Sequence, residues 1–324
     1  MELSDLDMEL KLAGIFRPYA AKRRESFVAT NGRFVHYTSA DNAIKIIQTK
    51  RFWMRNAKCM NDYMEISHGH ELLVKFFNDQ ERRKLFFEVL EPFEDDVAQN
   101  VLNLFDQWWN RIQFNTFICC ISEHDPSENA HGRLSMWRAY GQTSAKAAVV
   151  LNVPFEPDNA TKDLSLFMTP AAYFSYEDVE RELLEVIANI KEATQFLLSV
   201  GSKIITDNIF GMLVMAAVSF KHEGFKEERE WRVIYLPDLH RSNLMSRSLE
   251  TIDGVPQSIY KIPLEDNPNE DVIGISIPEL IESVIVGPSE YALPLHEAFT
   301  IALKEAGIEN AGSRVIISGI PLRT

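Results

Sequence analysis

The stretch NGRFVHYTSADNAIKIIQTKRFWMR, residues 31–55, has the pattern of a strand, a helix and a second strand. An Asn-Gly turn signal precedes residues 33–38, whose aromatic and β-branched side chains predict a strand. Thr38 or Ser39 can cap the helix that follows. Its buried side is supplied by three residues at the spacing of one helical face: Ala43, Ile46 and Ile47. Residues 51–55 then predict the second strand.

The rest of the chain also has the patterns of short strands and helices. Six further short strands are expected, over residues 114–122, 147–153, 230–235, 259–264, 284–287 and 315–318. Helices are expected over residues 62–111 with a break at Pro92, over 134–140 ending at Gly141, over 177–220, and from Ser289 to Gly307. About eight strands with helices between most of them predict an α+β fold, with a single mixed, mostly antiparallel sheet and helical insertions.

The expected organisation is one domain with a short leader. Residues 1–30 have the pattern of a polar N-terminal lead-in, helical or loosely ordered. Residues 31–324 are expected to form a single α+β domain, because the sequence contains neither an internal repeat nor a low-complexity linker. Its helical insertions are expected at about residues 62–111 and 177–220.

Composition limits the class of protein. The chain has 324 residues, a formal charge of −14 and 46% hydrophobic residues, which is enough for a core and argues against general affinity for nucleic acid or anionic lipid. Three cysteines are too few for a disulfide framework. The longest apolar run, residues 209–220, is shorter than the ~20 residues of a membrane span. We therefore expect a cytoplasmic protein that does not engage a membrane.

Charge is unevenly distributed along the chain. From Lys22 to Lys58 there are nine basic residues against two acidic ones, whereas from Glu88 to Glu128 there are nine acidic residues and one arginine. The basic stretch could hold a small anion such as a nucleotide pyrophosphate. The alternative is that the two stretches face each other or are simply solvated.

Common catalytic motifs are missing, which leaves three clusters of polar residues. No phosphate-binding loop, dinucleotide fingerprint, Gly-x-Ser-x-Gly or His-Glu-x-x-His occurs. The first cluster is His36 to Ser39, where a histidine beside the free N–H groups of a helix start could bind an anionic or polyhydroxyl ligand. The alternative is a core histidine followed by ordinary capping residues.

The second cluster opens a predicted strand. If residues 228–232 are extended, Glu228, Glu230 and Arg232 share one face, a set suited to a developing positive charge or to ribose hydroxyls. The alternative is an edge strand that carries charges in water.

The third cluster begins the helical region after residue 60. Glu65 and His68 have the Glu-x-x-His spacing of carboxylate-bridged metal sites, with His70 nearby, but a second copy of the motif is missing. Asp62 as a helix cap, with Glu65 three residues later, accounts for part of the pattern without a metal.

Six short patches in order resemble an uncharacterised bacterial family of unknown function, over roughly residues 33–290. They are VHYTS at 35–39, FWMRN at 52–56, MNDYME at 60–65, FICCIS at 117–122, LSMWRAY at 134–140 and EREWR at 228–232. The opening patch also looks like the first strand and helix of the ADP-ribosyltransferase superfamily, which includes toxins that modify nucleic acids.

The resemblance to ADP-ribosyltransferases implies a fold, a substrate and a set of roles. In that superfamily a first-strand histidine holds the adenosine ribose of NAD, aromatic residues enclose the nicotinamide, and a later glutamate contacts the nicotinamide ribose. It implies a catalytic pair, Glu230 with Glu228. It also implies a set of residues that bind NAD: His36, Tyr37, Thr38, Trp137, Tyr140 and Arg232. A carboxylate near the oxocarbenium-like state would lower the barrier to cleavage of the glycosidic bond.

Three functions therefore remain open. The first is an ADP-ribosyltransferase-like protein that binds or cleaves NAD, with a protein or nucleic acid as acceptor. Such a protein could serve in bacterial defence or stress. The second is a non-catalytic ligand- or protein-binding module on the same scaffold. The third is a metal-dependent hydrolase that uses Glu65, His68 and His70. If His36, Tyr140 and Glu230 lined one cleft, the first would be favoured.

Overall fold

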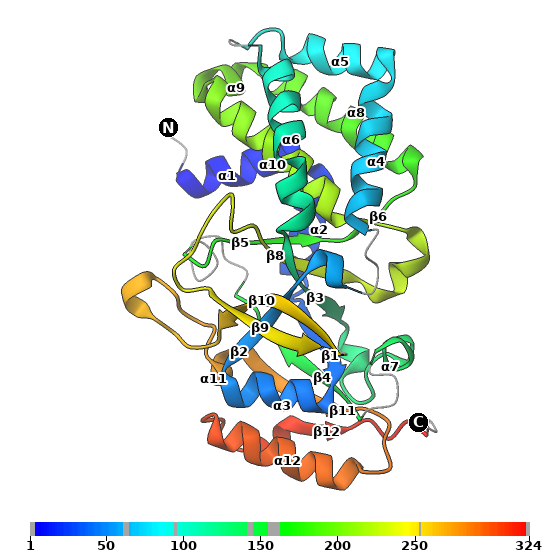
Figure 1. Ribbon diagram of the computed structural model, residues 1–324, viewed down its shortest axis with the longest axis vertical. Coiled ribbons are helices and arrows are strands. Elements are labelled where there is room, and N and C mark those ends of the chain that lie inside the picture. Colours follow the sequence, from blue (N-terminus) through cyan, green and yellow to red (C-terminus); the bar gives the residue numbers. More distant parts are fainter. Residues whose placement is uncertain are drawn as a thin grey trace. The chain divides into compact units, whose positions relative to one another are not determined.

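The computed structural model describes residues 4–60, 65–93, 96–140, 145–154, 163–252 and 254–321. The chain divides into two compact units. The helical unit comprises Met1–Phe27, Ala57–Thr116 and Thr169–Lys226, and the sheet unit comprises Val28–Asn56, Phe117–Met168 and Glu227–Thr324. The two expected helical insertions therefore lie in one unit together with most of the expected lead-in (Figure 1).

The α-helices have the following bounds: α1 Asp5–Phe16, α2 Pro18–Ala29, α3 Ala40–Thr49, α4 Glu65–Asn78, α5 Gln80–Leu90, α6 Val97–Phe114, α7 Leu134–Ala139, α8 Tyr176–Glu192, α9 Thr194–Val200, α10 Ser202–Ser219, α11 Ile277–Leu280 and α12 Ala292–Glu305. Short 3-10 helices are η1 Ala57–Cys59, η2 Pro126–Glu128, η3 Glu223–Glu228, η4 Pro268–Glu270 and η5 Ala311–Arg314.

The strands have the following bounds: β1 Arg33–Ser39, β2 Arg51–Asn56, β3 Phe117–His124, β4 Lys146–Leu151, β5 Leu166–Pro170, β6 Ala172–Tyr173, β7 Phe220–Lys221, β8 Glu230–Tyr235, β9 Ser246–Ile252, β10 Val255–Pro263, β11 Ile281–Val286 and β12 Val315–Ile317.

The fold is α+β with a mixed, mostly antiparallel sheet, which confirms that part of the prediction. The ten-stranded sheet has the order β12-β11-β4-β1-β3-β2-β10-β9, with β8 paired to β3 and β5 paired to β8. The pair β11 and β12 is parallel, while the pairs around β1 and β3 are antiparallel. All eight predicted strands are present, at slightly different ends. The likeness to the ADP-ribosyltransferase fold stays a prediction.

The strand, helix and strand predicted from residues 31–55 form as β1, α3 and β2. The Ser39 hydroxyl caps α3 by accepting the Asn42 backbone N–H at 3.2 Å. The predicted apolar face of α3 is buried, and the helix packs against β1, β2, β4 and α12 (Figure 1). Lys50 ends the helix in the left-handed conformation, which turns the chain into β2.

Trp137 is the centre of the core beneath α7. A cluster of buried residues surrounds it: Val35, Tyr37, Met136, Ala148, Val150 and Ile285. A Cβ atom on Gly132 or Gly287 would come within about 3 Å of the indole, at 2.7 and 3.0 Å respectively. The two glycines therefore leave the space that the indole occupies.

In the helical unit, the region expected to break at Pro92 is broken at two places. The turn that holds Pro92 separates α5 from α6, as predicted. A second break lies at Asp79, whose carboxylate accepts the backbone N–H groups of Glu81 and Arg82 at 3.0 Å and so begins α5. The expected cap at Asp62 and the expected helix end at Gly141 lie outside the described residues.

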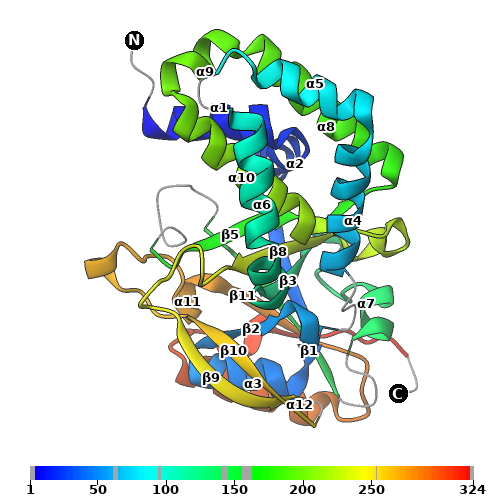
Figure 2. The ribbon, with the colours of Figure 1, turned by 45° about the horizontal axis from the view of Figure 1, so that its top comes forward.

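Helices α4 and α10 approach closely at Gly69, where a Cβ atom would lie 2.3 Å from the Ala217 carbonyl oxygen. Figure 2 shows α10 running beside α6 within this unit, and the two helices are in contact. By length and composition α10 is the one helix in the described part of the chain that could cross a membrane. Half of it is buried within the protein, and helices of a protein core pass the same test.

The lead-in is helical, one of its two expected forms: α1 buries Leu12, Ile15 and Phe16 in the helical unit and contacts α8 and α10. Strands β5, β6, β7 and β9 were not predicted. Strand β9 lies at a sheet edge with polar residues at most positions, so it lacks the apolar alternation that predicts a strand.

Candidate functional site

His36 lies where β1 and β2, which both pair with β3, diverge from each other. Strand β3 pairs with β1 only through Ser122–His124 and with β2 only through Phe117–Ile118, so on that side the intervening residues lack a strand partner. The His36 Nδ1 atom lies 2.9 Å from the Cys120 carbonyl oxygen, and its ring meets that of Phe52 edge-on at 4.8 Å. The imidazole therefore replaces backbone pairing where β1 and β2 diverge.

The surroundings of the His36 imidazole favour its neutral form. Burial lowers its pKa below the usual value because the imidazolium loses hydration, although the hydrogen bond to Cys120 partly offsets this. A carbonyl oxygen can only accept, so Nδ1 carries the proton and Nε2 is an acceptor. The side chain is half-buried, and none of the described residues pairs with Nε2. Such an atom can accept a hydrogen bond from a ligand hydroxyl.

Glu230 and Arg232 form a buried ion pair. The Arg232 Nε atom lies 2.7 Å from Glu230 Oε1, and the two side chains are 1% and 3% exposed respectively. The predicted shared face of these two residues is confirmed. Glu228 is not in the strand: it ends the 3-10 helix η3, and Arg229 follows with a φ of +45°. The condition under which Glu228 would join that face, an extended chain from residue 228, is therefore not met.

His36 and Glu230 lie on opposite faces of the sheet. The register aligns Val35 of β1 with Ser122 of β3, and Ser122 with Glu230 of β8, so these three share one face. His36 follows Val35 and points to the other face. On that other face the rings of Phe34 and Trp231 meet at 5.5 Å.

The aromatic residues expected around a nicotinamide belong largely to the core. The Tyr37 hydroxyl accepts the Arg133 backbone N–H at 2.7 Å, and burial raises its pKa to about 12. The Trp137 indole N–H donates to the His131 carbonyl oxygen at 2.7 Å. Tyr140 is partly buried against the same cluster, while Thr38 lies on the His36 face with its hydroxyl 3.5 Å from Asn42 Nδ2.

Arg133 organises the polar layer next to this core, and sequence patterns did not identify it. Its guanidinium donates to both carboxylate oxygens of Glu128, at 2.8 and 3.0 Å. It also donates to the backbone carbonyl oxygens of Glu123, Glu227 and Glu228, at 2.8 to 3.1 Å. The five N–H groups are thereby used, so Arg133 joins the end of β3, the start of α7 and the chain entering β8.

His124 is enclosed beside Arg133. Its Nε2 donates to Asn129 Oδ1 at 2.8 Å, and that oxygen also accepts from Arg33 at 2.8 Å, which fixes it as an acceptor. The other nitrogen, Nδ1, is buried without a partner in the described chain, 3.9 Å from the Glu128 carboxylate. Burial lowers the pKa of His124 below its usual value.

The basic stretch pairs with acidic residues spread along the sequence. Its ion pairs join Lys22 to Glu185, Arg33 to Glu282, Lys45 to Asp41, and both Lys50 and Arg51 to Glu265. Most of these side chains are exposed, so each pair contributes little to stability. These separate ion pairs fit the alternative of solvated charges better than a single binding site for a phosphate group.

The expected metal ligands lie on α4. The His70 ring stacks on Trp109, with centroids 3.7 Å apart and planes at 12°, and burial lowers its pKa. His68 is half-buried, and the side chain of Glu65 lies outside the described part of the structure. Across the described residues, His, Cys, Asp and Glu side chains form no group of three that could hold a metal ion.

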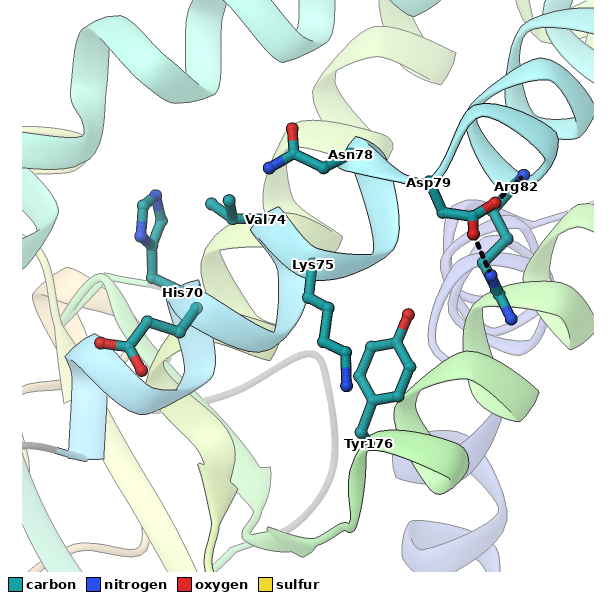
Figure 3. Close-up of a pocket in the computed structure, with 8 residues that line it drawn as sticks. His70, Val74, Lys75, Asn78, Asp79, Arg82 and Tyr176 are labelled. Carbon is teal, nitrogen blue, oxygen red and sulfur yellow. Dashed lines mark hydrogen bonds and ion pairs between the residues drawn. The ribbon is translucent and has the colours of Figure 1, made fainter.

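An open pocket of about 790 Å³ lies on the helical unit and was not anticipated from the sequence (Figure 3). It is lined by one side of α4 and the starts of α5 and α8: His70, Glu71, Val74, Lys75, Asn78, Asp79, Arg82 and Tyr176. Its volume is within the range of small-molecule sites. The only sequence signal is the polar spacing along α4, which also fits a solvated helix face.

Comparison with known proteins supports the resemblance to a family of unknown function. A family model described as "Protein of unknown function (DUF2971)" matches residues 136–233, so this part of the chain is a domain of that family. No curated protein matches the chain, and no solved structure matches it. The matched range begins within α7 and ends within β8. It therefore contains Trp137, Tyr140 and the Glu230–Arg232 pair.

Proposed function

We propose that this protein is a non-catalytic ligand-binding module. The observation that carries the proposal is the state of Glu230, whose carboxylate is 3% exposed and held 2.7 Å from the Arg232 guanidinium. A carboxylate that stabilises an oxocarbenium-like state must lie beside the reacting carbon with its charge available. Here the charge is balanced by a buried cation, which makes Glu230 a structural residue.

The arrangement of the other expected site residues supports the same conclusion. Tyr37 and Trp137 are 4% and 1% exposed, and both use their polar atoms for hydrogen bonds within the protein. His36 points to the opposite face of the sheet from Glu230. Side chains that share a fold but do not converge can maintain a scaffold without transferring a group.

A second candidate is an ADP-ribosyltransferase-like enzyme that uses NAD as substrate, with a protein or nucleic acid as acceptor. His36 favours it, because a neutral imidazole with an acceptor nitrogen suits a ribose hydroxyl. In this candidate Glu230 would have to exchange its Arg232 partner for the nicotinamide ribose.

Incubation of the full chain with nicotinamide-labelled NAD separates the two functions. The binding module releases nicotinamide at the rate of a no-protein blank, with or without added protein or nucleic-acid acceptors. Release that disappears in His36→Ala and in Glu230→Gln, while the variants stay folded by circular dichroism, would overturn the proposal. The location expected for either function is the cytoplasm.

A further inference from the structure

We propose that the pocket formed by α4, α5 and α8 binds the anionic group, a carboxylate or a phosphate, of a small molecule, with Lys75 as its principal contact. This inference rests on the proposed binding function and gives it a site and a ligand class. All eight lining residues belong to the helical unit, so the pocket is formed within one compact unit.

The charges at one end of the pocket are already used. The Arg82 guanidinium contacts the carboxylates of Asp79 and Glu180, each at 2.5 Å. Asp79 also accepts the backbone N–H groups of Glu81 and Arg82 at the start of α5. The hydrogen bond from the Arg82 N–H is the main cause of the lowered pKa of Asp79. The Arg82 guanidinium is therefore shared by two carboxylates, which leaves one negative charge in excess at this end of the pocket and no cation there for a ligand.

Lys75 is the available cation. Its Nζ atom lies 3.5 Å from the centroid of the Tyr176 ring, and Figure 3 shows the side chain running from α4 toward that ring. No carboxylate among the described residues forms an ion pair with it. A cation held over an aromatic face keeps its charge and its N–H donors. Lys75 thus lies against the Tyr176 ring and can still donate to an anion.

Neutral donors also line the pocket. Tyr176 carries a phenol and Asn78 carries an amide that points away from the Lys75 ammonium (Figure 3), and each group can donate to the oxygen atoms of a ligand. His70 is held flat against Trp109 and is uncharged at neutral pH because burial lowers its pKa. It offers hydrogen bonding without charge at the other end of the pocket.

Glu71 and Val74 define how the ligand lies. Glu71 stands one helical turn before Lys75, and its carboxylate repels an anion from that end of the pocket. Val74 is 40% exposed and gives the pocket an apolar patch. A ligand with an anionic group toward Lys75 and a less polar body over Val74 fits this distribution.

Calorimetric titration of the full chain at low ionic strength tests the site, with inorganic phosphate and malonate as separate probes. We expect saturable binding of at least one probe, and a rise in Kd of about tenfold or more in Lys75→Gln. Lys203→Gln is the matched control, because Lys203 is also exposed and lies on α10 away from the lining residues. Glu71→Gln should tighten binding.

Equal binding by wild type and Lys75→Gln, or equal loss in Lys75→Gln and Lys203→Gln, would overturn the site, the second result showing a general charge effect. Absence of binding for both probes would overturn it too. The proposed function has a different test: it fails if the protein releases nicotinamide from NAD, whatever the result of the titrations. Thermal midpoints of the unliganded variants check that Lys75→Gln and Glu71→Gln retain the fold.

Discussion

Replacing Glu230 by glutamine separates a structural carboxylate from a catalytic one. The substitution keeps the shape of the side chain and removes its charge, which leaves the Arg232 guanidinium buried at 1% exposure. Removing one partner of a buried ion pair costs about 3–5 kcal/mol, because the remaining buried charge loses the opposite charge that offset its desolvation. We therefore expect Glu230→Gln to destabilise the sheet unit by that amount.

Hydrogen exchange read on peptides from β3 and β8 measures this cost locally. A loss of about 3–5 kcal/mol corresponds to exchange that is faster by roughly two to four orders of magnitude wherever exchange requires opening of this part of the sheet. Glu227→Gln is the matched control, since it removes the same charge from an exposed side chain and keeps the backbone carbonyl that Arg133 binds. The control should exchange like wild type.

The double variant Glu230→Gln with Arg232→Met tests the physical reason. When both charges are absent, the penalty of a buried guanidinium without its Glu230 counter-charge disappears, so part of the lost stability should return. A structural role for the Glu230 carboxylate would be refuted if Glu230→Gln left exchange in β3 and β8 unchanged. It would be refuted more strongly if that variant also abolished a nicotinamide release seen in wild type.

Three other substitutions test the packing and the polar layer. Gly69→Ala should destabilise the helical unit by about 1–3 kcal/mol in urea denaturation, because its Cβ would lie 2.3 Å from the Ala217 oxygen, whereas Gly211→Ala, with open space around it, should be neutral or slightly stabilising. Arg133→Lys should lower the midpoint of thermal unfolding, since each buried acceptor left without a donor costs about 1–3 kcal/mol. Burial lowers the pKa of His124 from 6.5, so the unfolded chain binds its proton more readily and stability should fall as pH drops below about 6.5. In His124→Gln the thermal midpoint should depend less on pH between about 7.5 and 5.5, and an unchanged dependence would contradict this assignment.

Much of the fold could be predicted because its signals are local. The run Arg33–Ser39 forms β1, and Ser39 caps α3, because turn residues, β-branching and capping act within a few residues. Strand β9 could not be predicted in the same way, since an exposed edge strand does not need an apolar face. The division into two units was not predicted either, because residues 57–116 and 169–226 come together only through tertiary contacts.

The site was harder to predict because it depends on register and on burial. The spacing of Glu230 and Arg232 correctly placed them on one face, but whether that face meets solvent depends on what packs over it. Likewise, the face of His36 relative to Glu230 depends on how β1 and β8 each pair with β3. A slip of one residue in either pairing would put both side chains on the same face, and nothing in the sequence specifies that register.

Residues of the sequence motifs that lie within the matched range 136–233 have structural roles in this fold. Met136, Trp137 and Tyr140 of the first motif belong to the core cluster or pack against it. In the last motif, the Glu228 carbonyl oxygen accepts from Arg133, and Glu230 pairs with Arg232. Evidence for function therefore has to come from side chains that the fold leaves available, such as His36 and Lys75.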